Sequence, residues 1–98
     1  VCDLIYFQSD KVEELVNMLF SCGDCDAILL NPGAYTHTSI ILADTIRAIN
    51  VPVIEVHISN LFSRENYRRK SFISSVCRGF ISGFGLKSYE LALLSVIH

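Results

Sequence analysis

The chain has 98 residues, about the usual length of one domain, so we expect a single domain over residues 1–98. Apolar residues make up 51% of the chain and charged residues only 18%, against about 45–50% and about 25% in a typical soluble domain. This surplus indicates subunit interfaces, or a domain that lacks a piece. The net charge of −2 argues against nucleic acid or an anionic membrane surface as a partner.

The sequence also argues against a membrane-spanning or secreted protein. No apolar run approaches the roughly 20 residues that span a bilayer, and the opening VCDLIYFQSD lacks the basic region of a signal peptide. The four cysteines are too few and too unevenly spaced for a disulfide framework. We therefore expect a soluble, cytoplasmic protein with reduced cysteines.

The first half of the chain predicts a strand, a helix and a second strand. Residues 1–7, VCDLIYF, form an apolar run with β-branched and aromatic members, which is typical of a strand. Asp10 and Glu13 fit a capping box, and Gly23 fits the end of the helix that follows. Residues 26–31, DAILLN, are apolar throughout, as in a strand covered on both faces. The apolar stripe of the helix, at i, i+3, i+4 and i+7, is Val12, Leu15, Val16 and Leu19.

The pair Cys22 and Cys25, in the sequence CGDC, has a spacing that is known from redox and metal sites. A redox Cys-x-x-Cys opens a helix, whose dipole lowers the thiol pKa, whereas this pair follows a predicted helix. A zinc site would need a second pair of ligands at a similar spacing. We therefore expect an ordinary loop.

The second half of the chain continues the succession of strands and helices. It predicts a helix over residues 38–50, a strand over 51–59, a strand interrupted by glycines over 76–85 and a closing helix over 88–97. The order β-α-β-α-β-β-α is typical of an open, three-layer α/β fold of the flavodoxin-like type. No acidic pocket or phosphate loop is present, which argues against a response or nucleotide domain.

Polar residues gather at the carboxyl end of the strand over 51–59. Its side chains alternate, so Glu55, His57 and Ser59 share one face. Open α/β sheets hold their ligands at this edge, and Asn31 ends the preceding strand at the same edge. Glu55 can orient His57 as a general acid or base. The pattern alone leaves the alternative open, a structural histidine beside a capping asparagine.

His37 lies in NPGAYTHTS, residues 31–39, near the start of a helix. The Pro-Gly turn before it leaves backbone N–H groups at the helix start, which suit an anionic or carbonyl ligand. The pattern does not decide between a binding and a structural role for His37.

The stretch over residues 60–71, NLFSRENYRRKS, is polar and helix-like for a turn or two. Arg64 and Arg68 are four residues apart and share a face if the stretch is helical. Arg68 can point to the polar sheet edge and bind oxygen atoms, while Arg69 and Lys70 fit a solvated face.

Four motifs in this order and spacing, NPGAYTHTS, PVIEVHISN, SRENYRRKS and GFGLKSYELAL, resemble type II 3-dehydroquinate dehydratase. The resemblance covers nearly the whole chain from YFQSD onward. It implies a flavodoxin-like fold with strand order 2-1-3-4-5, and a homo-oligomer that is a dodecamer built from trimers. The implied reaction is the reversible dehydration of 3-dehydroquinate to 3-dehydroshikimate in the shikimate pathway, without metal or organic cofactor. A tyrosinate forms an enolate, and a histidine then protonates the departing hydroxyl.

The resemblance also implies roles for individual residues. His57 matches the general acid and Glu55 its supporting carboxylate. Arg64 matches a motif arginine near the family's mobile lid, without an assigned role. The remaining matches hold the substrate: Asn31, His37 and Arg68 hold its hydroxyl groups, and Ile58 and Ser59 bind its carboxylate, partly through backbone N–H groups.

One departure from the family bears on activity. The family's first strand and its motif NGPNLNxLGxRxPxxYG, which supplies the base tyrosine, are not found in these 98 residues. We therefore expect this chain to lack the first strand, the lid and the first helix, and to be inactive alone. A truncated homologue that binds a quinate-like acid, or that serves only in assembly, is the alternative. The tyrosines present, Tyr6, Tyr35, Tyr67 and Tyr89, belong to other motif positions.

Overall fold

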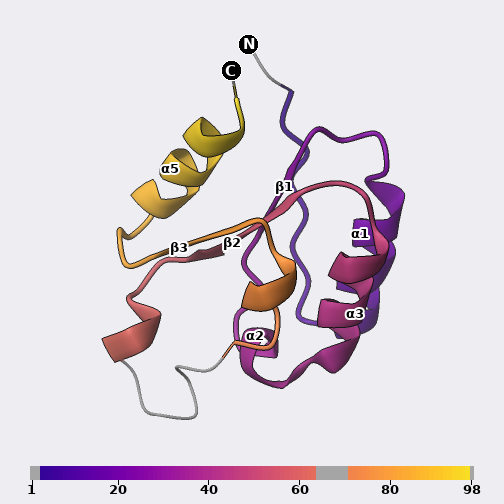
Figure 1. Ribbon diagram of the computed structural model, residues 1–98, viewed down its shortest axis with the longest axis horizontal. Helices are drawn as coiled ribbons and strands as arrows, with labels where there is room; N and C mark the ends of the chain where they lie inside the picture. The colour runs from indigo at the N-terminus through magenta and orange to yellow at the C-terminus, as the bar shows by residue number, and fades with distance from the viewer. Residues whose placement is uncertain (1–2, 64–70, 98) are drawn as a thin grey trace.

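The computed structural model describes residues 3–63 and 71–97, in which helices and strands alternate (Figure 1). The strands are β1 (Ile28–Leu30), β2 (Val53–His57) and β3 (Gly79–Ser82). The helices are α1 (Val12–Ser21), α2 (Tyr35–Thr38), α3 (Ile40–Ala48) and α5 (Lys87–Val96). Two short 3-10 turns, η1 (Leu61–Ser63) and η2 (Ser74–Val76), lie between β2 and β3. None of the helices in the described ranges is long and apolar enough to cross a membrane.

The strands form one parallel sheet in the order β1-β2-β3. Leu30 pairs with Glu55, and Glu55 pairs in turn with Phe80, so the carboxyl ends of the strands lie at one edge. Helices α1 and α3 pack on one face of the sheet, and α5 packs on the other (Figure 1). The predicted three-layer α/β class is confirmed.

Strand β2 is the centre of the fold because all five of its residues are buried. Its β-branched side chains divide between the two layers: Val53 joins the cluster under α1 and α3, and Ile54 and Val56 join the cluster under α5. This alternation leaves Glu55 and His57 on the α1 and α3 side of the sheet. The packing therefore fixes which way the polar pair points.

Helix α1 forms on the predicted apolar stripe but without the predicted capping box. Leu15 and Leu19 are buried in the cluster with α3. The N-cap residue is Lys11, and it makes no side-chain cap hydrogen bond. Ser9 performs the local bonding instead, since its Oγ accepts the Lys11 N–H at 3.0 Å and donates to Glu14 at 2.5 Å.

The predicted strand over residues 1–7 is wrong for its described part. Residues 3–9 form no strand, and the side chains of Leu4, Ile5 and Tyr6 are exposed. A strand exists only by pairing, and in the described residues β1 is bonded on one side only, to β2. The segment crosses the molecule to the start of α1 (Figure 1), where the Tyr35 hydroxyl donates to the Asp10 carbonyl at 2.6 Å.

Several predicted elements are shorter in the structure than in the sequence pattern, and two of them end at identifiable residues. The predicted helix over 38–50 corresponds to α3, which begins after Ser39, whose Oγ caps the helix by accepting the Leu42 N–H at 3.1 Å, and ends at Ala48. The separate helix α2, which ends at Thr38, was not predicted. The predicted strand over 76–85 shrinks to β3, because Gly83 adopts φ +98°, a left-handed conformation that ends regular pairing.

Candidate acid–base site at the carboxyl edge of the sheet

A carboxylate and an imidazole are paired inside the protein at the carboxyl end of β2. The side chain of Glu55 is fully buried, and His57 is 8% exposed. The Nε2 atom of His57 is hydrogen-bonded to the Oε2 atom of Glu55. The ring of Phe80 from β3 packs against the imidazole, with ring centroids 5.7 Å apart. The two residues that alternation placed on one face are therefore brought into direct contact.

Two serines that the sequence analysis did not single out complete the surroundings of Glu55. The Ser74 hydroxyl donates to Oε1 at 2.6 Å, and the Ser71 hydroxyl lies 3.2 Å from Oε2 and 3.3 Å from Oε1. Both carboxylate oxygens thus accept hydrogen bonds, as a buried charged group requires. Burial, followed by the charge of Glu55, raises the pKa of the nearby Cys77 thiol to about 12.

This arrangement is suited to proton transfer. With Nε2 held against the carboxylate, the other ring nitrogen, Nδ1, is the one that His57 can present to a ligand. A neighbouring carboxylate stabilises the charged imidazolium, which is the form that donates a proton. The pair therefore has the composition and contact of a general acid with its support.

The connection from β3 to α5 holds the backbone that follows the pair. Gly83 lies here at φ +98°, and an added Cβ would lie 3.3 Å from the Cβ of Asn60. The exposed residues Ile58 and Ser59 follow β2 directly. Two carbonyls are bound by this connection: that of His57 by the Gly83 N–H at 3.2 Å and that of Ile58 by the Gly85 N–H at 2.9 Å. The carbonyl of Ser59 is bound at 3.0 Å by the hydroxyl of Ser82, the last residue of β3.

Asn31 lies at the same sheet edge but turns towards the opposite layer. It directly follows β1, and its Nδ2 donates to the Tyr89 hydroxyl of α5 at 2.9 Å. Its Oδ1 accepts the Gly33 N–H at 3.2 Å. Tyr89 packs against the α5 side of the sheet, whereas Glu55 and His57 face the α3 side. The structure therefore brings Glu55 and His57 together and places the Asn31 amide across the edge from them.

Three other candidates fall outside what the structure describes. The backbone of His37 belongs to α2, but the position of its side chain lies outside the described residues. Arg64 and Arg68 also lie outside them.

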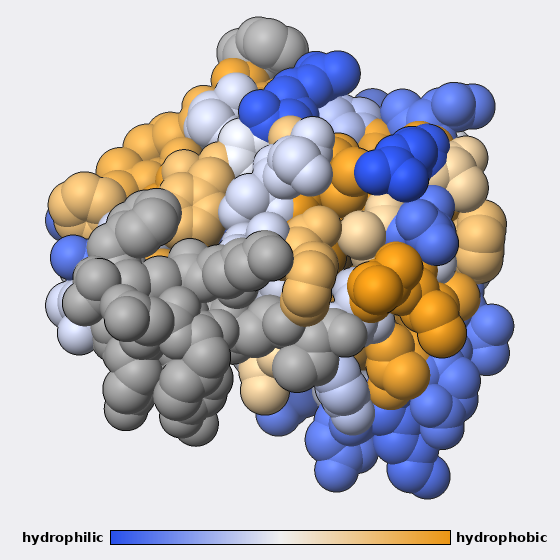
Figure 2. Space-filling model, turned by 60° about the horizontal axis from the view of Figure 1, so that its bottom comes forward, coloured by the Kyte–Doolittle hydropathy of each residue, from blue (hydrophilic) through white to orange (hydrophobic). Residues whose placement is uncertain are grey.

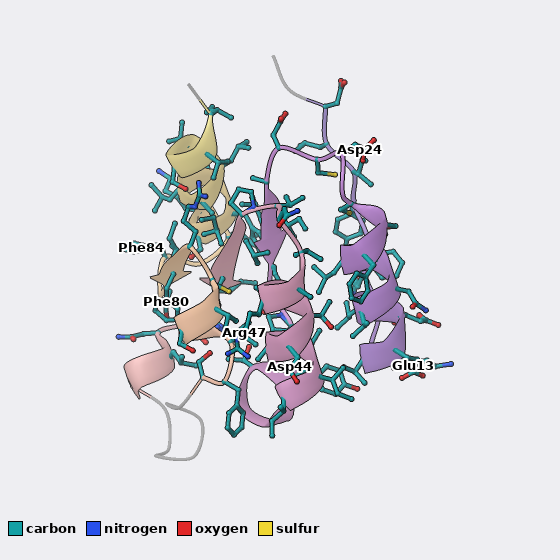
Figure 3. The ribbon with its side chains drawn as sticks, turned by 45° about the vertical axis from the view of Figure 1, so that its right-hand side comes forward. Glu13, Asp24, Asp44, Arg47, Phe80 and Phe84 are labelled. Carbon is teal, nitrogen blue, oxygen red and sulfur yellow. The ribbon has the colours of Figure 1, made fainter. Side chains whose placement is uncertain are left out.

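The CGDC loop lies at the end of α1, away from this site. Figure 3 shows Asp24 of the loop far from Phe80, which marks the site. The pKa of the Cys25 thiol is raised, first by desolvation, then by its hydrogen bond and charge interaction with Cys22, and further by Asp24 and Asp26. A reactive redox thiol requires a lowered pKa. Within the described residues, no group of three or more His, Cys, Asp or Glu side chains could hold a metal ion.

The fold and the paired side chains define an open α/β protein with a buried carboxylate–imidazole pair at the carboxyl edge of its sheet. The chain belongs to the class II dehydroquinase family, whose sequence profile, described as "Dehydroquinase class II", matches residues 1–97.

Relatives at the sequence level carry the name 3-dehydroquinate dehydratase. One, from a Nitratiruptor species, is 50% identical over 95 residues, which are 96% of this chain and 61% of the relative. Another, from Thermoanaerobacter pseudethanolicus, is 52% identical over 90 residues, or 91% of this chain and 61% of the relative.

Solved structures of type II dehydroquinases are similar in three dimensions. That from Propionibacterium acnes has a TM-score of 0.86 and 39% identity, over 91% of this chain and 66% of the other. That from Butyrivibrio crossotus has a TM-score of 0.88 and 37% identity, over 91% of this chain and 63% of the other. The chain thus spans 61% to 66% of the length of these four proteins.

Proposed function

We propose that the full-length protein is a 3-dehydroquinate dehydratase that reversibly converts 3-dehydroquinate to 3-dehydroshikimate through an enolate. The observation that carries this proposal is the buried pair of Glu55 and His57 at the sheet edge of a class II dehydroquinase. Burying a carboxylate costs free energy unless the group is hydrogen-bonded or paired with a charge. Here the carboxylate of Glu55 is hydrogen-bonded directly to the imidazole of His57.

His57 is the proposed general acid. Its imidazolium donates the Nδ1 proton to the departing hydroxyl, which leaves as water while the enolate becomes the conjugated ketone of the product. Glu55 supports the charged ring through Nε2. The base that begins the reaction is a tyrosinate of the family's amino-terminal motif, which no residue of this chain matches, so the proposal concerns the full-length protein. The reaction as proposed uses no metal or organic cofactor.

The proposed substrate contacts come from three parts of the chain. The backbone of Ile58 and Ser59 binds the carboxylate, and this proposal is supported by the carbonyl bonds that fix residues 57–59 in place. Asn31, His37 and Arg68 hold the hydroxyl groups. For Asn31 this requires its amide to bond substrate as well as, or in place of, the Tyr89 hydroxyl.

The proposed assembly is a homo-oligomer, a dodecamer built from trimers. Figure 2 shows apolar side chains lying at the surface on one face of the molecule. Among the exposed large apolar residues are Ile40, Ile41, Phe84 and Leu86, with exposures of 63%, 61%, 61% and 77%. Exposed apolar area of this kind is typical of protein interfaces. Sedimentation of the full-length protein tests the assembly.

The activity is tested with the full-length protein by following the ultraviolet absorbance of the conjugated product. His57→Ala is expected to lower kcat by about 10²–10⁴ while a quinate-like ligand still binds, because the acid acts in the transition state. Arg68→Ala is expected to weaken substrate binding through loss of a charge-assisted contact. Arg47→Ala is the matched control, since Arg47 is an exposed arginine of α3 paired with Asp44.

Two results would contradict the proposal. A His57→Ala variant with near-normal kcat would remove His57 from the role of acid. A wild-type protein that binds a quinate-like acid without turnover would favour the alternative, a non-catalytic homologue.

A further inference from the structure

The turn that contains Ser71 and Ser74 is bonded to the buried carboxylate of the site. Ser71 precedes the turn η2, and Ser74 is its first residue. Both hydroxyls bond to Glu55, from 16 and 19 residues further along the chain. Among the described residues, a segment distant in sequence therefore supplies two of the three side chains that hydrogen-bond to Glu55.

The hydroxyl of Ser71 has its direction fixed by the local backbone. A serine oxygen has two lone pairs and a single proton. The Ser71 oxygen accepts the N–H groups of Ile73 at 3.2 Å and of Ser74 at 3.1 Å, which occupies both lone pairs. Its proton is then available only for donation, and Glu55 is the acceptor within reach. Glu55 therefore acts as an acceptor at this contact.

The hydroxyl of Ser74 makes the shorter of the two contacts. Its oxygen lies 2.6 Å from Oε1 of Glu55, within the range of about 2.5–2.7 Å that is typical of O–H···O⁻ bonds. With Ser74 on Oε1 and His57 on Oε2, the carboxylate plane is fixed at both oxygens. The nitrogen of His57 that faces this oriented carboxylate is Nε2.

The turn itself is anchored on two sides, which allows it to hold the carboxylate in place. The Phe72 N–H donates to the Thr36 carbonyl of α2 at 2.8 Å. The Arg78 N–H donates to the Val53 carbonyl of β2 at 2.8 Å. Between these two points Ile73 is fully buried in the core cluster with α3. The serines are therefore presented to Glu55 from a fixed segment.

We propose that Ser71 and Ser74 are positioning residues that hold Glu55 as an oriented acceptor, so that His57 keeps its Nε2–H towards Glu55 and presents Nδ1 to the substrate. The proposal rests on the proposed function of His57 as general acid. Both serines act through their hydrogen bonds to Glu55 and not by contact with the substrate.

Steady-state kinetics of the full-length protein provide the first test. Ser74→Ala is expected to lower kcat by about 10- to 100-fold, the factor that corresponds to a lost hydrogen bond to a charged group, with KM changed by less than about 2-fold. Ser74→Thr keeps the hydroxyl and is expected to recover most of kcat. Ser75→Ala is the matched control, because Ser75 is an exposed neighbour in the same turn.

A double-mutant cycle separates positioning from a general structural effect. If Ser74 acts through Glu55, Ser74→Ala is expected to have little further effect on kcat in a Glu55→Gln background. A full additional loss in that background, or a Ser74→Ala variant with unchanged kcat, would overturn the proposal. Ser71→Ala provides a second variant with the same expected pattern, should Ser74→Ala fail to fold.

A spectroscopic measurement tests the positioning without relying on turnover. The ¹⁵N chemical shifts of the His57 ring are expected to show a single Nε2–H tautomer in the neutral ring of the wild type and a tautomer mixture in Ser74→Ala. If the wild type lacks turnover but shows this difference, the proposed function fails while the positioning role stands. If the wild type is active and the Ser74→Ala and Ser71→Ala variants both keep the wild-type tautomer, the positioning role fails and the proposed function stands.

Discussion

Replacing Glu55 is the perturbation that most directly tests how the centre of this protein is held together. Glu55→Ala removes the acceptor of three donors at once: Ser71, Ser74 and His57. Glu55→Gln keeps the volume and one carbonyl oxygen. The two variants therefore separate the loss of the acceptor from the loss of the charge.

The expected size for Glu55→Ala follows from the burial of each donor. An unpaired buried donor costs about 1–3 kcal/mol, and the two half-buried serines fall at the low end because water reaches them. The cavity left by the side chain adds to this cost. Removing Glu55 also removes the desolvation penalty of a fully buried carboxylate, which offsets several kcal/mol of the loss. We expect a net destabilisation of about 2–4 kcal/mol.

For Glu55→Gln we expect a loss of only about 1 kcal/mol, since the glutamine oxygen accepts from both serines. Its amide nitrogen must then donate to Nε2 of His57, which moves the imidazole proton to Nδ1. The fold is kept, while the support of a charged imidazolium is lost.

Urea unfolding of the full-length variants, followed by circular dichroism at one fixed protein concentration, measures both effects. The slope with urea is expected to stay unchanged, so that the midpoints report stability. If Gln were as destabilising as Ala, or if Ala were neutral, the hydrogen bonds to Glu55 would not contribute as argued.

Three other outcomes are expected. The Cys77 thiol, with its pKa raised to about 12 from 9.0, keeps its proton in the folded state after the unfolded chain has lost it. Stability is therefore expected to fall as pH rises from about 9 to about 12, measured as urea midpoints, and Cys77→Ala should lessen this fall. Gly83→Ala is expected to lower the free energy of unfolding by about 1 kcal/mol or more, because a φ of +98° strains an alanine. It is also expected to lower kcat by disturbing the hydrogen bond from the residue 83 N–H to the His57 carbonyl. Unchanged urea midpoints would contradict the expected strain. The 98-residue chain expressed alone is expected to be inactive and to aggregate in size-exclusion chromatography, since in residues 3–63 and 71–97 no strand pairs with the second edge of β1. A monodisperse, cooperatively melting chain with turnover would refute this expectation.

The sequence was informative wherever local pattern and global packing agree. The alternation in β2 placed Glu55 and His57 on one face, because the side-chain period of a strand is independent of its neighbours. The rule that ligands bind at the carboxyl ends of parallel strands predicted a candidate site at this edge, where the structure pairs the two side chains. The stripe of α1 was equally reliable, since Leu15 and Leu19 are buried as its period requires.

Features that depend on contacts distant in sequence were missed or mistaken. Ser71 and Ser74 reach Glu55 only through the path of the connection between β2 and β3, and serines at such a spacing have no local signature. The apolar run at residues 3–7 looks like a strand, but strand formation depends on a partner rather than on the run itself. The amide of Asn31 lies on the α5 side, as continued alternation requires, because Leu29 joins the cluster under α5 and Leu30 the cluster under α3. The shared sheet edge predicted from the sequence therefore did not place Asn31 on the same face as Glu55 and His57.

The dual bonding of Ser71 has a consequence for local unfolding. Its oxygen closes the turn by accepting the amides of Ile73 and Ser74, and its proton is donated to Glu55. Opening the turn thus removes a donor from the carboxylate, and displacing the carboxylate removes the restraint on the turn. We therefore expect the turn and the Glu55–His57 pair to open together, so that the amide hydrogens of Ile73 and Ser74 exchange with solvent at the rate at which the pair separates.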